Sequence, residues 1–334
     1  MIQEPRAPEL RESEASYLNA FIAPLRPYLD RSDVTDIFIN GDTRVWAESV
    51  TGTVRCIDVP ALDEAWLWQL ARQIARKSHQ GINRESPILS AVLPDGTRIQ
   101  LIAPPATRQG IAVAFRRQVT MAMRLGDYTA AGAMPSPGAD DAHAGDRALA
   151  AAYDAHDYEQ FLRLAVRQRK TILIAGGTAT GKTTFANALL HEIPLHERLI
   201  LIEDTPELLP PQPNMVGLVA VRSALGETRV STDHLLQAVL RMRPDRIILG
   251  ELRGDEAFTF LRAVSTGHPG AISTIHADSA AHAVDQLALL VLQAGSRLEW
   301  QDVRRYVDKV IDIHVQLRRT PAGRRIDRIV WNRR

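Results

Sequence analysis

Short apolar runs separated by turn residues predict strands in the first part of the chain. Residues 34–40 and 44–48 flank a Gly-Asp turn and predict an antiparallel hairpin. Apolar side chains at helical spacing over residues 62–77 predict a helix on the same sheet. We therefore expect an α+β domain with a mainly antiparallel sheet over residues 14–118, preceded by a mobile N-terminus of residues 1–13. Its further strands are expected at residues 51–57, 94–102 and 110–117.

The pattern changes after residue 118. Residues 119–157 are rich in Ala, Gly, Pro and Ser and then become polar, which predicts a flexible linker. From residue 158, apolar runs without polar alternation are separated by segments of helical periodicity. Such runs are typical of strands buried on both faces of a parallel sheet, so an α/β domain is expected over residues 158–334. Its strands are expected at residues 199–202, 215–221, 246–249 and 271–275, its helices at 158–169, 233–243, 256–265 and 280–293, and a closing hairpin at 310–317 and 325–330.

A glycine-rich turn joins an apolar strand to a helix at residues 171–190 and predicts a phosphate-binding loop. Gly176 and Gly181 bracket four residues, and Lys182 and Thr183 follow at the start of the helix. Backbone N–H groups and the helix dipole then attract phosphate, while the lysine reaches the β/γ oxygens and the hydroxyl holds Mg²⁺. We expect ATP to contact Gly176, Gly177, Thr178, Ala179, Thr180, Gly181, Lys182, Thr183 and Thr184.

Three carboxylates, Glu203, Asp204 and Glu207, follow the strand expected at residues 199–202. The carboxyl ends of parallel strands are where an open sheet binds its ligand. Nucleotide hydrolysis needs carboxylates near Mg²⁺ and near the attacking water. We expect Glu203 and Asp204, together with Thr183, to hold Mg²⁺ or its waters.

Two further strand ends carry polar residues. Residues 246–249 run into Gly250 and Glu251, an atypical Walker B element with glycine where many nucleotide hydrolases have aspartate. Glu251 is therefore expected to act near the metal and the attacking water. His268 lies between glycines, and His276 follows a strand and is expected to sense or contact the γ-phosphate.

Several arginines lie near these segments. Arg241, Arg243 and Arg253 flank the Walker B strand, where they either clamp phosphate across a subunit boundary or form ordinary ion pairs. Arg98 and Arg116 lie at strand ends, and by spacing alone such exposed arginines are usually only solvated.

Composition narrows the class of protein. The 334 residues suffice for two domains, and 40 Lys+Arg against 39 Asp+Glu give a net charge of +1, which does not indicate a nucleic-acid binder. The single Cys56 cannot form an intramolecular disulfide, and we expect a reduced, cytosolic setting. The N-terminus has acids and prolines instead of an export signal, and no long apolar run predicts a spanning helix. Any membrane contact is therefore expected to be peripheral.

These motifs resemble, in order, those of the secretion traffic ATPases, the family that drives type II and type IV secretion, type IV pili and conjugation. Within that family the chain is most similar to the type IV secretion and conjugal-transfer branch, and most like the Trb-type conjugation ATPases. The type II branch commonly has a four-cysteine zinc module, which one cysteine cannot build. The resemblance rests on residues 34–41, 176–183, 203–207, 243–251 and 267–276, and the choice of branch on residues 240–246, 250–254 and 319–326.

The resemblance implies a RecA-like P-loop NTPase C-terminal domain joined by the linker to the α+β N-terminal domain, in a homohexamer with nucleotide between the domains. It also implies phosphate contacts from Arg98 and Arg116, and it leaves Glu207 and Glu251 as alternative bases. The implied function is MgATP hydrolysis that powers pilus assembly or substrate transfer at the cytoplasmic face of the inner membrane. The implied partners are the inner-membrane components and coupling proteins of the secretion system.

Other functions stay open at this point. A type IV pilus or type II secretion motor would share most of these motifs. A DNA-translocating motor is disfavoured by the near-neutral charge and by the lack of an aromatic and basic stacking surface. A scaffold that only binds nucleotide is disfavoured by the intact acids and histidines.

Overall fold

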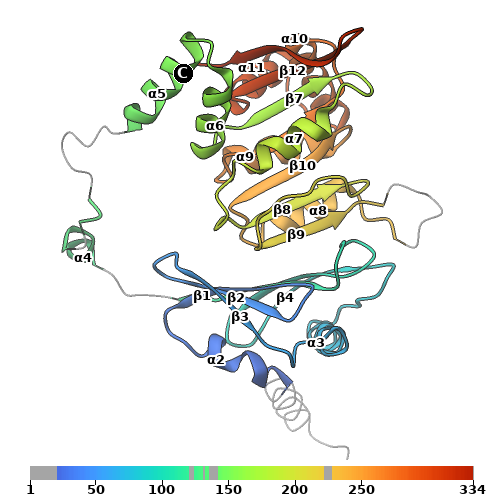
Figure 1. Ribbon diagram of the computed structural model, residues 1–334. Coiled ribbons are helices and arrows are strands. Elements are labelled where there is room, and N and C mark those ends of the chain that lie inside the picture. The colour runs from blue at the N-terminus through green and yellow to red at the C-terminus, as the bar shows by residue number, and fades with distance from the viewer. Residues whose placement is uncertain (1–20, 120–123, 131, 135–141, 222–227, 334) are drawn as a thin grey trace, which may run out of the picture. The chain divides into compact units, whose positions relative to one another are not determined.

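The structure is a computed structural model that describes residues 21–119, 124–130, 132–134, 142–221 and 228–333 (Figure 1). The predicted mobile residues 1–13 lie outside these ranges. Internal contacts divide the chain into two compact units, and the predicted domain bounds stay a prediction. Unit 1 comprises Met1–Gln118, His196–Glu207 and Gln212–Gly250, and unit 2 comprises Val119–Leu195, Leu208–Pro211 and Glu251–Arg334.

Unit 1 contains a six-stranded antiparallel sheet in the order β3-β2-β1-β6-β5-β4. The turn-separated apolar runs predict its antiparallel pairing and every strand except β4. Alternate side chains of these strands, such as Ile37 and Phe115, are buried in one core. The first strand of the sheet along the chain pairs with β2 and β6 over nearly its whole length. The strands are β1 (Val34–Asn40), β2 (Arg44–Ser49), β3 (Val54–Asp58), β4 (Ile88–Val92), β5 (Arg98–Ile102) and β6 (Ala112–Arg116).

Helices of the first 118 residues complete this core. In α3 (Glu64–Lys77), the Asp63 side chain accepts a hydrogen bond from the Trp66 N–H at 2.7 Å, which caps the helix. Leu67 and Leu70 lie on its buried face. Before β1 come the short η1 (Ala23–Leu25) and α2 (Arg26–Leu29), each with a proline in its first turn.

Unit 1 also holds three parallel strands in the order β10-β8-β9. The segment between β5 and β6 lies against β9, because the Arg108 N–H donates to Gly217 O and the Val219 N–H donates to Ala106 O, both at 2.9 Å. Ser231 caps α8, because its hydroxyl accepts a hydrogen bond from the His234 N–H at 3.2 Å. The elements are β8 (Leu199–Glu203), β9 (Met215–Val219), α8 (Thr232–Val239) and β10 (Arg246–Leu252), of which Arg246–Gly250 belong to unit 1.

Unit 2 is built on four strands in the order β13-β12-β7-β11, where β11, β7 and β12 are parallel and β12 and β13 form the predicted hairpin. No helix within the described ranges is long and apolar enough to cross a membrane. The strands are β7 (Ile172–Gly176), β11 (Ile272–Ile275), β12 (Ile313–Thr320) and β13 (Gly323–Trp331). The helices are α4 (Leu125–Ala130), α5 (Ala142–Asp154), α6 (Tyr158–Arg167), α7 (Lys182–Leu190), α9 (Glu256–Ser265), α10 (Ala280–Gln293) and α11 (Trp300–Val310).

The predicted linker, residues 119–157, differs from the structure in its second half, which forms α5. Leu149 is fully buried, and Tyr153, four residues later, packs its ring against Phe161 and Trp331. The Tyr153 hydroxyl also donates to Ile329 O at 3.0 Å. Alanine favours helix, and these two large side chains anchor that helix to unit 2. The part of the linker at residues 120–123, 131 and 135–141 lies outside the described residues.

Candidate nucleotide site

The phosphate loop of unit 2 has the backbone that its glycines predict. A Cβ on Gly176 would lie 2.4 Å from Thr180 Oγ1 and 3.2 Å from Leu317 O, so no side chain fits there. Gly181 has φ +94°, in the left-handed region that favours glycine. The Thr180 hydroxyl closes the loop by donating to Gly177 O at 2.9 Å. Thr178, Ala179 and Thr184 are exposed, and Gly177, Gly181, Lys182 and Thr183 are half-buried.

Lys182 begins α7 and folds back over the loop. Its Nζ donates to Gly176 O at 2.9 Å and to Gly177 O at 3.3 Å, and lies 3.8 Å from Glu251 Oε1. Burial lowers the pKa of the Lys182 ammonium, while the Glu251 carboxylate opposes that shift. Arg253 Nε donates to Glu251 Oε2 at 2.5 Å. Unit 2 therefore brings the predicted lysine and the predicted Walker B acid together.

His276 follows β11 at the same sheet edge. Ile275, the residue before it, pairs with Ala175, the residue before Gly176, so the histidine and the phosphate loop leave the sheet at one level. His276 is exposed. His268 instead points its Nδ1 at Ala263 O, 3.1 Å away, which is a local structural contact.

The acidic cluster belongs to unit 1, and its first member is engaged in an ion pair. Glu203 at the end of β8 is buried and pairs with Arg108, whose pKa is lowered by burial. Glu203 Oε1 also accepts a hydrogen bond from the Glu207 N–H at 2.9 Å. The Glu207 side chain is exposed, and Asp204 is half-buried. Arg108 carries no local sequence signal for this role, because its partner lies far along the chain, at position 203.

Glycines create the room for this ion pair. A Cβ on Gly250 would lie 3.0 Å from Glu203 Cγ, which explains the glycine at the atypical Walker B position. A Cβ on Gly217 would lie 2.3 Å from Arg108 Cδ, so the arginine stem passes directly over this residue. The stem of the Glu203 side chain thus occupies space that a side chain at position 250 would need.

Three arginines of unit 1 line one cavity of about 530 Å³. Arg98 and Arg116 are directly opposite each other on β5 and β6. Arg241 donates to Ser90 Oγ at 3.0 Å, and Ser90 donates to Gln100 Oε1 at 2.6 Å. Like charges directly opposite each other in a sheet are unfavourable, so the cavity is suited to an anion.

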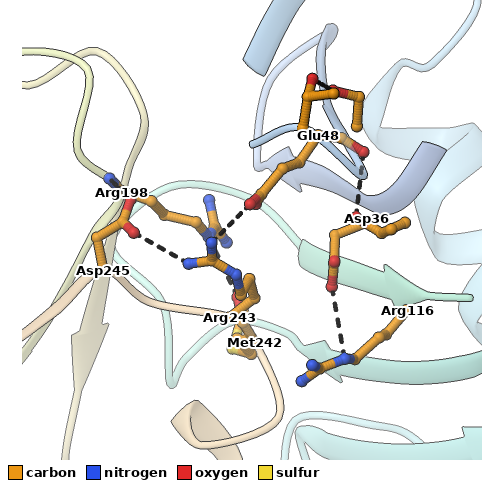
Figure 2. A network of polar contacts seen from close by, with 10 residues as sticks. Asp36, Glu48, Arg116, Arg198, Met242, Arg243 and Asp245 are labelled. Atoms are coloured by element: carbon orange, nitrogen blue, oxygen red, sulfur yellow. Dashed lines mark hydrogen bonds and ion pairs between the residues drawn. The ribbon is translucent and has the colours of Figure 1, made fainter. Parts of the chain in front are cut away.

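Figure 2 shows the polar network beside this cavity. Arg243 bonds to Glu48 at 2.5 Å and to Asp245 at 3.0 Å, which is the ordinary ion-pair alternative for that arginine. Arg198 is fully buried, its N–H donates to Asp245 Oδ2 at 2.7 Å, and burial lowers its pKa to about 9. Arg116 Nε lies 3.9 Å from the buried Asp36 (Figure 2). The network fixes the turn that leads from α8 into β10.

The oxygen atoms of side chains around the loop are suitable ligands for Mg²⁺. Among the described residues, no group of three or more His, Cys, Asp or Glu side chains forms a ready metal site. Mg²⁺ usually needs only one or two protein oxygens, because substrate phosphates and water supply the rest. The Thr183 hydroxyl in the first turn of α7 and the Glu251 carboxylate beside Lys182 are such oxygens.

Comparison with known proteins places this arrangement in a family. A family model described as "Type II/IV secretion system protein" matches residues 22–317. The chain belongs to this family. Among its relatives are VirB11 of Brucella suis biovar 1 (strain 1330), 38% identical over 317 residues with 92% of this chain and 88% of that protein covered, and PtlH of Bordetella pertussis (strain Tohama I), 39% identical over 319 residues with 94% and 92% covered.

A solved structure of the same family also resembles this chain. The VirB11 ATPase from the Brucella suis type IV secretion system, in complex with sulphate, superposes with a TM-score of 0.89 at 36% identity. The superposition covers 97% of each chain. The predicted fold class, with a RecA-like ATPase domain, and the predicted membership of the type IV secretion ATPases are confirmed.

Proposed function

We propose that this type IV secretion traffic ATPase hydrolyses MgATP at the phosphate loop of unit 2. The observation that carries the proposal is the placement of Lys182 Nζ on the loop carbonyls and 3.8 Å from the Glu251 carboxylate. A cation for the phosphates and an acid for the attacking water therefore lie within one small region of the unit.

Lys182 and the start of α7 bind the phosphates. The bonds from Lys182 to Gly176 O and Gly177 O hold the ammonium over the loop, from which it transfers to the β/γ oxygens of the nucleotide. The N–H groups of the first helical turn add donors that have no acceptor within the helix. His276, exposed at the same sheet edge, is placed to contact the γ-phosphate.

Thr183 and Glu251 would hold Mg²⁺, directly or through its waters, with Asp204 and Glu203 as further candidates. Mg²⁺, when bound, neutralises negative charge on the phosphate oxygens. Because Glu203 is paired with Arg108, we expect it to act mainly by fixing the end of β8, which leaves Asp204 as the stronger candidate of the two.

Glu251 is the better candidate for the residue that orients or deprotonates the attacking water. Its side chain is mostly buried, and Lys182 and Arg253 hold it from two sides. Glu207, the alternative base, is exposed and belongs to unit 1. Substituting each acid by Gln separately distinguishes the two.

Arg98, Arg116 and Arg241 are proposed to bind a phosphate group and to stabilise charge that develops on it. Their support is the shared cavity of unit 1, where three fixed positive charges converge. Asp36 lies 3.9 Å from Arg116 and limits the orientations of that guanidinium.

The finer assembly is also proposed. We expect a homohexameric ring at the cytoplasmic face of the inner membrane, in contact with inner-membrane components and coupling proteins of a type IV secretion or conjugative transfer system. ATP binding and hydrolysis would change the ring and power pilus assembly or substrate transfer.

Phosphate release by the purified full chain, measured across a size-exclusion profile with light scattering, tests the proposal. Activity is expected in a peak of roughly six subunits. Lys182→Ala should lose nucleotide binding and turnover, and Glu251→Gln should bind ATP but turn over at least about 100-fold more slowly. Glu159→Gln, an exposed acid on α6 that pairs with Arg163, is the matched control. Normal rates in Lys182→Ala would refute the site, and a larger loss in Glu207→Gln than in Glu251→Gln would reassign the base.

A further inference from the structure

The β12–β13 hairpin of unit 2 extends beyond the strand that ends in the phosphate loop. β12 runs parallel to β7 from the pair Ile313 and Ile172 to the pair Leu317 and Gly176 (Figure 1). β7 ends at Gly176, whereas β12 continues to Thr320 and then turns into β13. The tip of the hairpin therefore projects from the sheet edge at which the phosphate loop begins.

One side chain of this tip lies against the loop. A Cβ built on Gly181 would lie 3.2 Å from Arg324 Cδ and 4.0 Å from its Nε and Nη1. Gly181 immediately precedes Lys182, at the start of α7. The Arg324 guanidinium is thus beside the backbone that cradles the α/β-phosphates in loops of this type.

The charges of the hairpin tip are arranged in pairs of the same sign. Arg319 is directly opposite Arg324, and Arg318 is directly opposite Arg325. All four side chains are exposed, and no ion pair joins any of them to a residue within the described ranges. Like charges directly opposite each other destabilise a strand pair. A bound anion would reduce the repulsion between these arginines.

The two pairs lie on different faces of the hairpin. Directly opposite residues of an antiparallel pair share a face, and neighbours along a strand alternate. Arg324 and Arg319 therefore share the face that contacts the loop at Gly181, and Arg325 and Arg318 lie on the other face. Arg325 has the same charge and nearly the same position along the chain, but it does not face the loop.

We propose that Arg324, supported by Arg319 opposite it, is a nucleotide-binding residue that contacts the phosphate chain held by the loop. The inference rests on the proposed nucleotide site and adds to it a cation from the far end of the chain. A guanidinium presents several N–H donors in a fixed plane, which suits phosphate oxygens. Gly181 permits this approach, because any side chain there would displace the arginine stem.

Binding of the non-hydrolysable ATP analogue AMPPNP, with Mg²⁺, to the full-length protein tests the proposal by calorimetry. Arg324→Ala should raise Kd about tenfold, and Arg325→Ala should bind like the wild type. Arg324→Lys should recover part of the affinity, because the charge is kept but the planar set of donors is lost. The loss in Arg324→Ala should shrink as salt rises from about 0.1 M to about 1 M, since exposed charges are then screened.

Three outcomes would overturn the assignment. First, Arg324→Ala could bind the analogue as tightly as the wild type. Second, Arg325→Ala could lose as much affinity, which would indicate only a general effect of positive charge. Third, Arg324→Lys could bind as weakly as Arg324→Ala, which would indicate that the arginine packs against the nucleotide base instead of contacting phosphate. Lys182→Ala separates this failure from that of the site itself. If the wild type binds no better than Lys182→Ala, then the proposed nucleotide site has failed, not the assignment of Arg324.

Discussion

His314 should make unit 2 sensitive to acid. The residue lies in β12, between β7 and β13, where it pairs with Leu173 and Val330. Its side chain is 2% exposed. Neither ring nitrogen has a hydrogen-bond partner among the described residues. Burial lowers the pKa of His314 from 6.5 to about 4, because the charged imidazolium would lose its hydration.

The sign and the size of the effect follow from linkage. Below pH 6.5 the unfolded chain takes up a proton at this residue, whereas the folded protein does so only near pH 4, so acidification stabilises the unfolded state. The gap between 6.5 and about 4 corresponds to a loss of about 3 kcal/mol in the free energy of unfolding. About 2 kcal/mol of that loss should already be present near pH 5.

The substitution His314→Leu, of similar volume, removes the titrating group. Urea unfolding followed by circular dichroism near neutral pH and near pH 5 gives the free energy of unfolding for both proteins. The variant should gain about 2 kcal/mol relative to the wild type on going to the lower pH. Gln316→Leu, at the next inward position of the same strand, changes stability without a titrating group and serves as control. A difference between wild type and His314→Leu that is the same at both pH values would refute the reasoning.

Two other substitutions test buried ion pairs. Gly217→Ala places a Cβ 2.3 Å from Arg108 Cδ and separates Arg108 from Glu203, so it should cost about 3 kcal/mol in the free energy of unfolding. In a protein that already carries Arg108→Ala, adding Gly217→Ala should cost little more, because the clashing stem is gone. Additive costs in the double variant would contradict the clash. Glu197→Gln breaks a fully buried pair in which Arg246 Nε and Nη2 donate to the two carboxylate oxygens at 2.6 and 3.0 Å, so about 3 kcal/mol should be lost as well, and an unchanged urea midpoint would show that the amide replaces the carboxylate.

Local patterns predicted much of the fold. Most strands and the closing hairpin follow from periodicity and turn residues. The glycine spacing predicted the turn between β7 and α7, over which Lys182 folds. Helix α11 was not predicted, although Val303, Val307 and Val310 recur at helical spacing and are buried. Strand β4 (Ile88–Val92), a short strand between turn residues, was not predicted either.

Long-range contacts explain what the sequence could not supply. Arg108 gains its role only when its segment lies against β9, which pairs with β8 and so places Glu203 beside it. Arg324 comes to lie beside Gly181 only when β12 aligns with β7. The same limit applies to α5, where an Ala-rich segment has the composition of a linker until Tyr153 meets Phe161 and Trp331. Spacing identifies a motif, whereas these partners are fixed only by the topology of the sheets.

The passage of the Arg108 stem over Gly217 also restricts how this sequence can change over generations. A lineage that replaces Gly217 first produces a protein in which a buried carboxylate has lost its counter-ion, and selection removes it. A lineage that first replaces both Arg108 and Glu203, and only then adds a side chain at position 217, no longer meets the clash with the arginine stem. The glycine is therefore the last of the three residues that can be exchanged, although it carries no chemistry of its own.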